Sequence, residues 1–456
     1  MNVITRVRNY IKKRFDHIRN ERVKLSILQA IPFWIASLLT GLIAVLYAKL
    51  FAWTESVSAS VYGPHRWMLF IQAPVFMLLG WWLVKLFAPG SRGSGIPQVM
   101  AAIDMAAAPK YKKSISSLLS IRIAITKIAS SLSLVMGGAA IGREGPTIQI
   151  AGSVFDFIYK YIPSSWPKLA RPNMIVAGAA AGLAAAFNTP LGGVVFAVEE
   201  LSRTHISFYR TALFSAVIIA GLTAQGILGP YLYLGYPEVA GTSWFMFLLI
   251  FLVAVLAGIA GSYLCHLILR VLRWKAATFT KTFQHILFIT ICALLLASFA
   301  FFVNTAILGS GKEIMQEVLF TAEKTQAWYI TPLRLIGPLF SFTTGGAGGV
   351  FAPGLTAGAC MGASVADWFH LSATDTNLLI LAGMVSFLTG ITRTPFTSAI
   401  LVLEMTDRHS VIFYLMLAAL VANIASLVID KKSFYDYLKH DFIHEFGKTD
   451  QLKIES

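Results

Sequence analysis

Long runs of apolar residues, separated by short polar stretches, make up most of the chain. A helix needs about 20 apolar residues to cross the hydrocarbon core of a bilayer, and many of these runs reach that length. The pattern therefore predicts an all-α protein that crosses a membrane several times. The clearest runs are Leu25 to Leu50, Met68 to Leu86, Phe245 to Leu269, Ile286 to Val303 and Val411 to Ile429.

Glycine and proline interrupt several of the apolar stretches. The main interruptions are residues 93–97 (GSGIP), 142–146 (GREGP) and 348–354 (GGVFAPG). Irregular backbone is costly in lipid unless the freed amide and carbonyl groups line a cavity inside the protein. We therefore expect tilted and half-spanning helices that begin or end at these segments.

An internal repeat divides the chain into two related halves, at about residues 25–230 and 240–430. Such halves are typical of transporters, which place the substrate site near the interface between them. An offset of 205 residues superposes Ala177-Gly178 on Ala382-Gly383, Thr189-Pro190 on Thr394-Pro395, and Glu199 on Glu404. A nearby offset of 208 superposes Gly137-Gly138-Ala139 on Gly345-Gly346-Ala347.

The composition agrees with a membrane protein. Hydrophobic residues make up 56% of the chain and charged residues 13%, whereas soluble domains carry about 25% charged residues. The net charge of +15 comes mostly from residues outside the apolar runs, so it indicates membrane topology and gives no reason to expect nucleic acid as a partner. We expect lipid to surround the protein.

The basic residues suggest an orientation. The segment 1–24 is strongly basic and is expected to be a cytoplasmic helix ahead of the membrane domain at 25–440, with a short cytoplasmic tail at 441–456. The basic stretches at 110–113 and 270–281 are also expected in the cytoplasm, and residues 312–324 outside. This arrangement places the N-terminus in the cytoplasm.

No residue pattern suggests a metal site or an enzyme. The three cysteines, Cys265, Cys292 and Cys360, stand alone in or beside apolar runs, which favours a packing role over metal ligation or disulfides. No GxSxG or HExxH motif is present, and no Ser/His pairing lies within the apolar runs. We therefore expect neither catalysis nor a cofactor.

The segment Gly142-Arg143-Glu144-Gly145-Pro146 has the features of an anion site. Glycines let the backbone approach an ion closely, and Pro146 suits the first turn of a helix. Exposed amides at a helix start bind anions, and the Glu144 carboxylate, when charged, would compete for that place. A structural ion pair between Arg143 and Glu144 is the alternative, but ionisable residues at membrane depth are functional candidates by default.

The other two interruptions share this chemistry. Residues 348–354 offer amides at a helix start without a carboxylate, so they could contact an anion permanently. Residues 93–97 add the hydroxyl of Ser94 as a further donor.

In this order, the three segments resemble the signature segments of the CLC chloride channel and transporter family. The similarity continues through residues 184–200 and 400–407 and so covers most of residues 25–440. It implies a CLC-type inverted repeat of two halves and a homodimer in which each subunit has its own anion pathway. The absence of C-terminal regulatory domains, which larger members carry, implies a compact prokaryotic form in the inner membrane.

The resemblance also assigns roles to residues. The hydroxyls of Ser94 and Tyr435 and the amides of Val350 and Phe351 would bind the central anion. Tyr435 alone would be an ordinary interfacial aromatic residue, and Tyr437, two positions later, is an alternative match.

Two glutamates would handle protons in this family pattern. Glu144 would be the external gating and proton-accepting residue, with the amides from Arg143 to Gly145 holding the outer anion. Glu200 matches the inner glutamate of the exchangers, although an interfacial charge near Arg203 is the alternative. Lys127, in an apolar run, matches a basic position in relatives and would support the pathway electrostatically unless it snorkels.

Three transport functions fit these residues. Exchange of chloride for protons is favoured by Glu200, because channels of the family commonly have a non-acidic residue there. A passive chloride channel is the second possibility, and an exchanger of another small anion is the third. Ser94 favours chloride, but binding of other halides is also expected because backbone amides do not discriminate sharply by size.

Overall fold

The computed structural model describes residues 21–108, 111, 114–163, 166–201, 210–229, 232–239, 243–321, 324 and 326–451. These residues form helices and no strand; only two isolated β-bridges link loops. Residues 1–20 of the expected basic helix lie outside the described residues, as do Lys110, Lys112 and Lys113.

Eight of the described helices are long and apolar enough to cross a membrane. Each of the five apolar runs falls largely within one of them, so the predicted spans are confirmed. The eight are α2 (Glu21–Tyr62), α3 (Leu69–Phe87), α5 (Ile121–Met136), α9 (Arg210–Leu228), α10 (Trp244–Thr278), α11 (Thr282–Phe302), α15 (Ala373–Thr392) and α17 (Ile412–Ser426).

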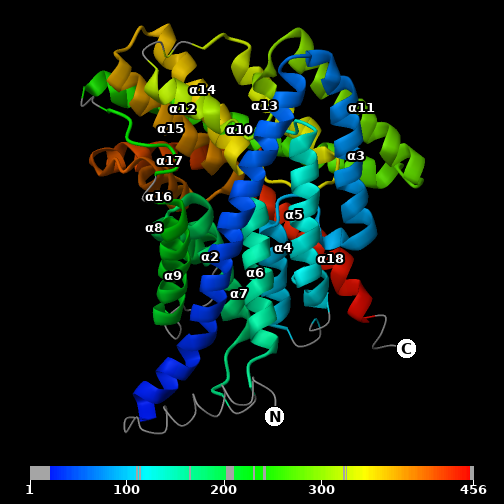
Figure 1. Cartoon of the computed structure of the whole chain (residues 1–456). Helices are drawn as coiled ribbons and strands as arrows, with labels where there is room; N and C mark the ends of the chain where they lie inside the picture. Colours follow the sequence, from blue (N-terminus) through cyan, green and yellow to red (C-terminus); the bar gives the residue numbers. More distant parts are fainter. Residues whose placement is uncertain are drawn as a thin grey trace.

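Shorter helices fill the space between the spans, and the expectation of half-spanning elements is confirmed. Among them, α4, α6 and α14 begin at the three Gly/Pro segments (Figure 1). The shorter helices are α4 (Ile96–Ala106), α6 (Glu144–Lys160), α7 (Arg171–Phe187), α8 (Pro190–Phe196), α12 (Lys312–Phe320), α13 (Ile330–Thr343), α14 (Phe351–Trp368), α16 (Pro395–Thr406) and α18 (Phe434–Gln451).

The repeat found in the sequence is visible as two matching helix pairs, α7 with α8 and α15 with α16. The carboxylate of Glu404, at the end of α16, accepts hydrogen bonds from the amides of residues 191 and 192 at the start of α8 (2.9 and 2.6 Å). Its counterpart Glu199 accepts from residues 396 and 397 at the start of α16 (3.1 and 2.7 Å). Each half therefore caps a helix of the other, which satisfies amides that have no partner within a helix.

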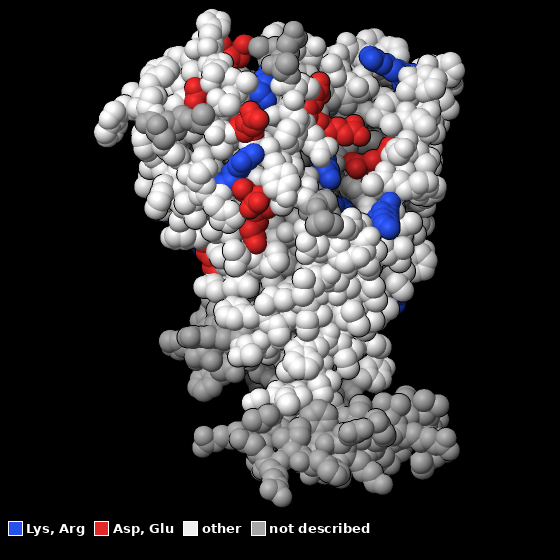
Figure 2. All heavy atoms as spheres, turned by 60° about the vertical axis from the view of Figure 1, so that its left-hand side comes forward, with Lys and Arg blue, Asp and Glu red and all other residues white. Residues whose placement is uncertain are grey.

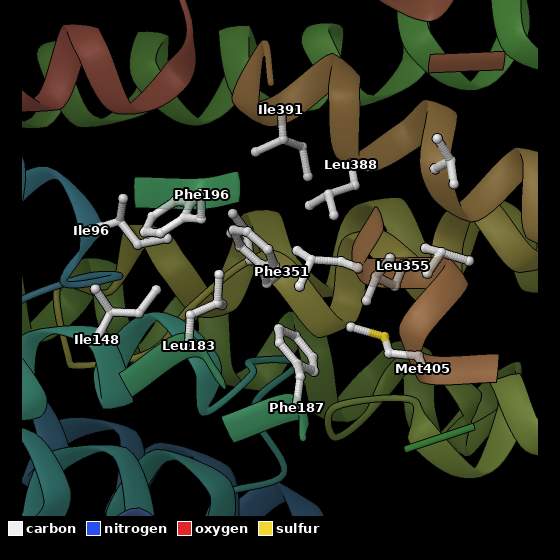
Figure 3. Close-up of a cluster of buried hydrophobic side chains, with 14 of the residues drawn as sticks. Ile96, Ile148, Leu183, Phe187, Phe196, Phe351, Leu355, Leu388, Ile391 and Met405 are labelled. Atoms are coloured by element: carbon white, nitrogen blue, oxygen red, sulfur yellow. The ribbon is translucent and has the colours of Figure 1, made fainter. Parts of the chain in front are cut away.

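Small residues let the inner helices approach closely. In α14 and α15, a Cβ added at Gly358 would collide with the carbonyl of Gly383, and the reverse is also true. A continuous apolar core lies between the two halves, and Figure 3 shows Ile96 of α4, Ile148 of α6 and Phe351 of α14 within it. All three cysteines are buried, as expected of packing residues.

The surface has the charge distribution of a membrane protein. On the face shown in Figure 2, charged side chains gather toward the upper end, and the band below carries almost none. Large apolar side chains such as Leu222, Leu248 and Ile424 are exposed on the long helices. These surfaces fit contact with lipid.

The last helix, α18, carries Tyr435 into the interior. Its buried Lys439 forms ion pairs with Asp104 of α4 (3.4 Å) and with Asp436 one turn earlier (3.3 Å). The helix continues beyond residue 440, so the described part of the expected tail is helical.

Candidate functional site

Backbone hydrogen bonds join the three glycine-rich segments in the middle of the protein. The amide of Gly93 donates to the carbonyl of Gly346 (2.8 Å), and that of Gly348 donates back to Gly93 (3.0 Å). Gly142 and Gly349 exchange a second pair of bonds (2.8 and 2.9 Å). We call this arrangement the loop junction. It brings together segments that are far apart in the sequence.

Glycine is needed at the loop junction because the backbones meet closely. A Cβ on Gly145 would collide with the Ser94 hydroxyl oxygen, and a Cβ on Gly348 would lie only 2.6 Å from the Ile141 side chain. Gly95, the N-cap of α4, has a φ of 110°, which favours glycine strongly. The predicted helix starts at Glu144 and Phe351 thus lie side by side.

Ser94 and Tyr435 are buried on one side of the junction, with exposures of 1% and 0%. The Tyr435 hydroxyl faces Ser94, and neither hydroxyl makes a well-formed hydrogen bond to a described residue. Tyr435 stacks on Phe351, with ring centroids 6.4 Å apart. Because buried polar groups ordinarily have partners, the two hydroxyls suit a guest that accepts hydrogen bonds.

Tyr437 does not share this position. Its hydroxyl donates to Asp430 (3.4 Å), and its ring lies under the guanidinium of Arg273 (5.2 Å). Tyr435 is therefore the better match for a residue that faces Ser94.

Glu144 lies on the other side of the junction. Its side chain is 1% exposed, and it accepts a hydrogen bond from the Tyr233 hydroxyl (3.3 Å) through Oε1. Oε2 has no hydrogen-bond partner among the described residues and points back toward Gly142. Arg143, the N-cap of α6, is close enough to interact electrostatically with this carboxylate.

An aromatic row connects the two sides. The ring of Phe187 packs against Tyr233 (5.1 Å between centroids) and against Phe351 (6.1 Å). Phe351 in turn stacks on Tyr435. Through Phe187 and Phe351, the row links Tyr233, the hydrogen-bond partner of Glu144, to Tyr435.

Lys127 is fully buried and does not snorkel. Its ammonium donates to the carbonyls of Ser91 (2.9 Å) and Gly93 (2.7 Å), in the loop that carries Ser94. The partner that sequence reasoning could not name is thus main chain, and the positive charge lies beside the Ser94 loop. Without a carboxylate partner there, this charge favours a nearby anion.

Lys275, in the basic stretch at 270–281, is buried. Its side chain is 9% exposed and donates to the carbonyls of Thr343 (2.7 Å) and Thr344 (3.2 Å), just before the 345–354 loop. The last turns of α10 reach far enough to place it under the loop junction.

Two cavities approach the junction from opposite sides. One, of about 270 Å³, is lined by Glu144 and Arg143 but not by Ser94. The other, of about 750 Å³, is lined by Ser94 and Lys275 but not by Glu144. The two cavities share no lining residue.

Glu200 lies on a π-helical turn, Ala197–Leu201, directly after α8. Its side chain is half-buried, and its charge is close enough to influence Tyr435. Arg203, considered as an alternative partner, lies outside the described residues.

Several residues of the two cavities were not singled out from the sequence. Tyr233 and Glu55 border the Glu144 cavity, together with Lys312. Glu55 carried a signal, because it is a carboxylate in the first long helix. Burial, followed by the nearby Arg143, lowers the pKa of Lys312 below its ordinary value. Nothing in the local sequence indicated that Tyr233 would reach Glu144.

The comparisons with known proteins identify the family. Residues 75–427 match the family described as voltage gated chloride channel, so the chain belongs to that family. The resemblance noted in the sequence is confirmed.

Relatives of known name are similar over almost the whole chain. The H(+)/Cl(-) exchange transporter ClcA of Citrobacter koseri is 27% identical over 453 residues, covering 93% of this chain and 91% of that protein. The protein of the same name from Cronobacter sakazakii is 26% identical over 424 residues, covering 88% and 87%.

Solved structures share the fold. A slow cyanobacterial Cl-/H+ antiporter superposes with a TM-score of 0.78 at 23% identity, covering 91% of this chain and 98% of that one. A eukaryotic CLC transporter gives 0.74 at 18% identity, covering 91% and 74%. A CLC-type fluoride/proton antiporter gives 0.72 at 19% identity, covering 91% and 98%.

Proposed function

We propose that this protein is a secondary active transporter that exchanges chloride for protons. The observation that carries the proposal is the position of Glu144: a buried carboxylate at the first residue of α6, beside the start of α14, where two sets of helix amides face one region. A carboxylate there can hold a proton or occupy an anion site, and it cannot do both at once. The names of the ClcA relatives support the same activity.

The anion pathway follows from the donors around the junction. Ser94 and Tyr435 supply hydroxyls, and the amides of Val350 and Phe351 supply the remaining contacts of a central chloride. The amides from Arg143 to Gly145 hold an outer chloride when Glu144 is protonated and has swung away. Lys127 adds positive charge behind the Ser94 loop.

Protons take a separate route on the inner side. Glu200 receives them from the cytoplasm and passes them toward Glu144, with Tyr435 between the two in electrostatic reach of both. Because both ions need Glu144, movement of one is linked to movement of the other. A channel would need no such inner carboxylate.

The test is a flux assay in liposomes. Purified protein is reconstituted with a chloride gradient, and external pH is followed as chloride leaves. We expect uphill proton movement in wild type, and none in Glu144→Gln or Glu200→Gln, while chloride flux persists in both. Glu317→Gln, an exposed charge on α12, is the matched control and should behave as wild type.

Other outcomes would redirect the proposal. Chloride flux without proton movement in wild type would make the protein a passive chloride conductor. Uphill proton movement with fluoride or nitrate, and none with chloride, would make it an exchanger of another small anion.

We further propose a homodimer in the prokaryotic inner membrane with a cytoplasmic N-terminus. Helices α8, α9, α16 and α17 form one side of the molecule (Figure 1). They expose large apolar side chains, among them Leu191, Phe214, Phe396 and Phe413. Cross-linking of a cysteine introduced at Leu191 tests the dimer, and a protease-sensitive tag at the N-terminus tests the orientation.

A further inference from the structure

The second half contains a loop of the same kind as the Ser94 loop. Residues 309–312 are Gly-Ser-Gly-Lys, and residues 93–96 are Gly-Ser-Gly-Ile. Each loop precedes a helix, α12 at Lys312 and α4 at Ile96. The backbone agrees as well: φ is 64° and 110° at the two glycines of the Ser94 loop, and 66° and 82° at those of the Ser310 loop.

Both loops are held by a buried cation from a helix of their own half. Lys127 of α5 binds two carbonyls of the Ser94 loop. Arg334 of α13, fully buried, donates to the carbonyls of residues 306, 308, 309 and 310 at 2.9–3.3 Å. Ser94 and Ser310 therefore each lie in a loop whose carbonyls bind a buried cation.

A tyrosine completes the match on each side. Tyr435 stacks on Phe351, the first residue of α14, and Tyr233 donates to Glu144, the first residue of α6. Ser94 with Tyr435 on the inner side thus corresponds to Ser310 with Tyr233 on the Glu144 side. Both members of the second pair line the 270 Å³ cavity.

A carboxylate already occupies the second loop. Glu55 of α2 accepts a hydrogen bond from the amide of Ser310 (2.9 Å) and interacts with its hydroxyl as well. Lys312 lies in the same cavity, with its ammonium 4.6 Å from the centre of the Tyr233 ring. The amide and hydroxyl of Ser310, which could bind an anion, are thus in contact with the carboxylate of Glu55.

We propose that the Ser310 loop is a further chloride site, beyond Glu144 on the outer side, and that Glu55 competes with chloride for it. Ionised Glu55 keeps the amide and hydroxyl of Ser310. Protonated Glu55 releases them, and chloride then binds there between Lys312 and Arg143. The inference rests on the proposed function, in which chloride enters past Glu144.

Several charged or titratable groups face Glu55 and set the balance between these states. Arg143 and Lys312 favour both the ionised carboxylate and a bound chloride, whereas Glu144 and Glu313 disfavour both. Those close enough to act on Glu55, or lining its cavity, are Tyr47, Lys49, Tyr62, Arg143, Glu144, Tyr233, Lys312, Glu313 and Arg334.

Chloride binding to the purified protein, measured by isothermal titration, tests the proposal. Glu144→Gln serves as the background, because it removes the other carboxylate that competes with chloride. In this background we expect chloride affinity to rise roughly three- to tenfold between about pH 7.5 and about pH 5, as the buried Glu55 carboxylate takes up a proton and releases the donors of Ser310.

Two added substitutions separate Glu55 from its neighbours. Glu55→Gln should leave the tighter binding at both pH values, so that the pH dependence disappears. Glu313→Gln removes another carboxylate, one that acts on Glu55 only through space, and it should keep the pH dependence. Equal pH profiles with and without Glu55→Gln would overturn the proposal.

A further variant, Lys312→Gln, tests the site independently, in case Glu55→Gln does not fold. Lys312→Gln should weaken chloride binding at both pH values, and unchanged binding would also contradict the site. Because the readout is binding and not coupled flux, the outcome is independent of whether the wild-type protein moves protons.

Discussion

The starts of α6 and α14 are built on one plan and differ in one functional position. Each begins two residues after a glycine of the junction, Gly142 or Gly349, and each has proline as its third residue. Where α6 has Glu144, α14 has Phe351. The shared frame supplies donors from both halves, and the single difference puts a titratable group on one side only. A repeated scaffold can thus hold an anion symmetrically and gate it asymmetrically.

Substitutions at Glu144 and Phe351, the position where the two helix starts differ, should have the largest effect on transport. Glu144→Gln should abolish proton movement, because an amide cannot take up a proton in this range. Phe351→Leu should keep proton coupling and weaken chloride binding, since the amide remains while the packing against Tyr435 is lost. Simultaneous chloride and proton fluxes from liposomes give the ratio for each variant, and loss of coupling in Phe351→Leu would contradict the assignment.

The cations behind the two Gly-Ser-Gly loops come next in magnitude. Arg334→Met leaves four carbonyls without their donor and should lower the stability by roughly 3 kcal/mol or more. Lys127→Met leaves two carbonyls without their donor and should lower the stability by about 2 kcal/mol. It should also weaken chloride binding at the central site. Thermal unfolding in detergent measures the loss of stability, and calorimetric titration measures the loss of chloride affinity. An equal loss of chloride affinity in both variants would contradict the assignment of Lys127 alone to the central anion site.

The reciprocal caps should give smaller and equal effects. Glu404→Gln and Glu199→Gln each remove a negative charge from the start of a helix in the opposite half, which should lower stability by roughly 0.5–1 kcal/mol. Thermal unfolding of the single and double variants checks this. If one variant is far more costly than the other, the two halves are not energetically equivalent at this point.

The smallest effect is expected from the Tyr233 hydroxyl. Tyr233→Phe removes one long hydrogen bond to Glu144 and should change the proton transport rate only a few-fold, in line with about 1 kcal/mol. Tyr435→Phe, which removes a hydroxyl facing Ser94, should instead change chloride affinity. Rates measured over a range of external pH would show whether the two tyrosines divide their effects in this way.

Features that depend on local composition were predictable from the sequence. The apolar runs gave the long helices, and the Gly/Pro interruptions gave the starts of α4, α6 and α14. The repeat was also visible, since Glu199 and Glu404 hold matching places. The roles assigned to Ser94, Glu144, Tyr435 and Glu200 remain predictions.

Features that depend on contacts between distant segments were not predictable. Lys275 belongs to a basic stretch, but its side chain is buried and donates to the carbonyls of Thr343 and Thr344, far along the sequence. Tyr233, in the segment between the two halves, reaches Glu144 although 89 residues separate them in the sequence. Hydropathy indicates whether a segment prefers lipid or water, but it does not specify which other segment its side chains will contact.

The loop junction has a consequence for how such a protein can diversify. Its four bonds run between main-chain groups of Gly93, Gly142, Gly346, Gly348 and Gly349, so none of them is made by a side chain. The side chains around the junction, Ser94 and Phe351 among them, can therefore be exchanged while the joint itself stays intact. Single substitutions of these side chains can therefore change the preference for one ion over another while the fold around the junction is kept.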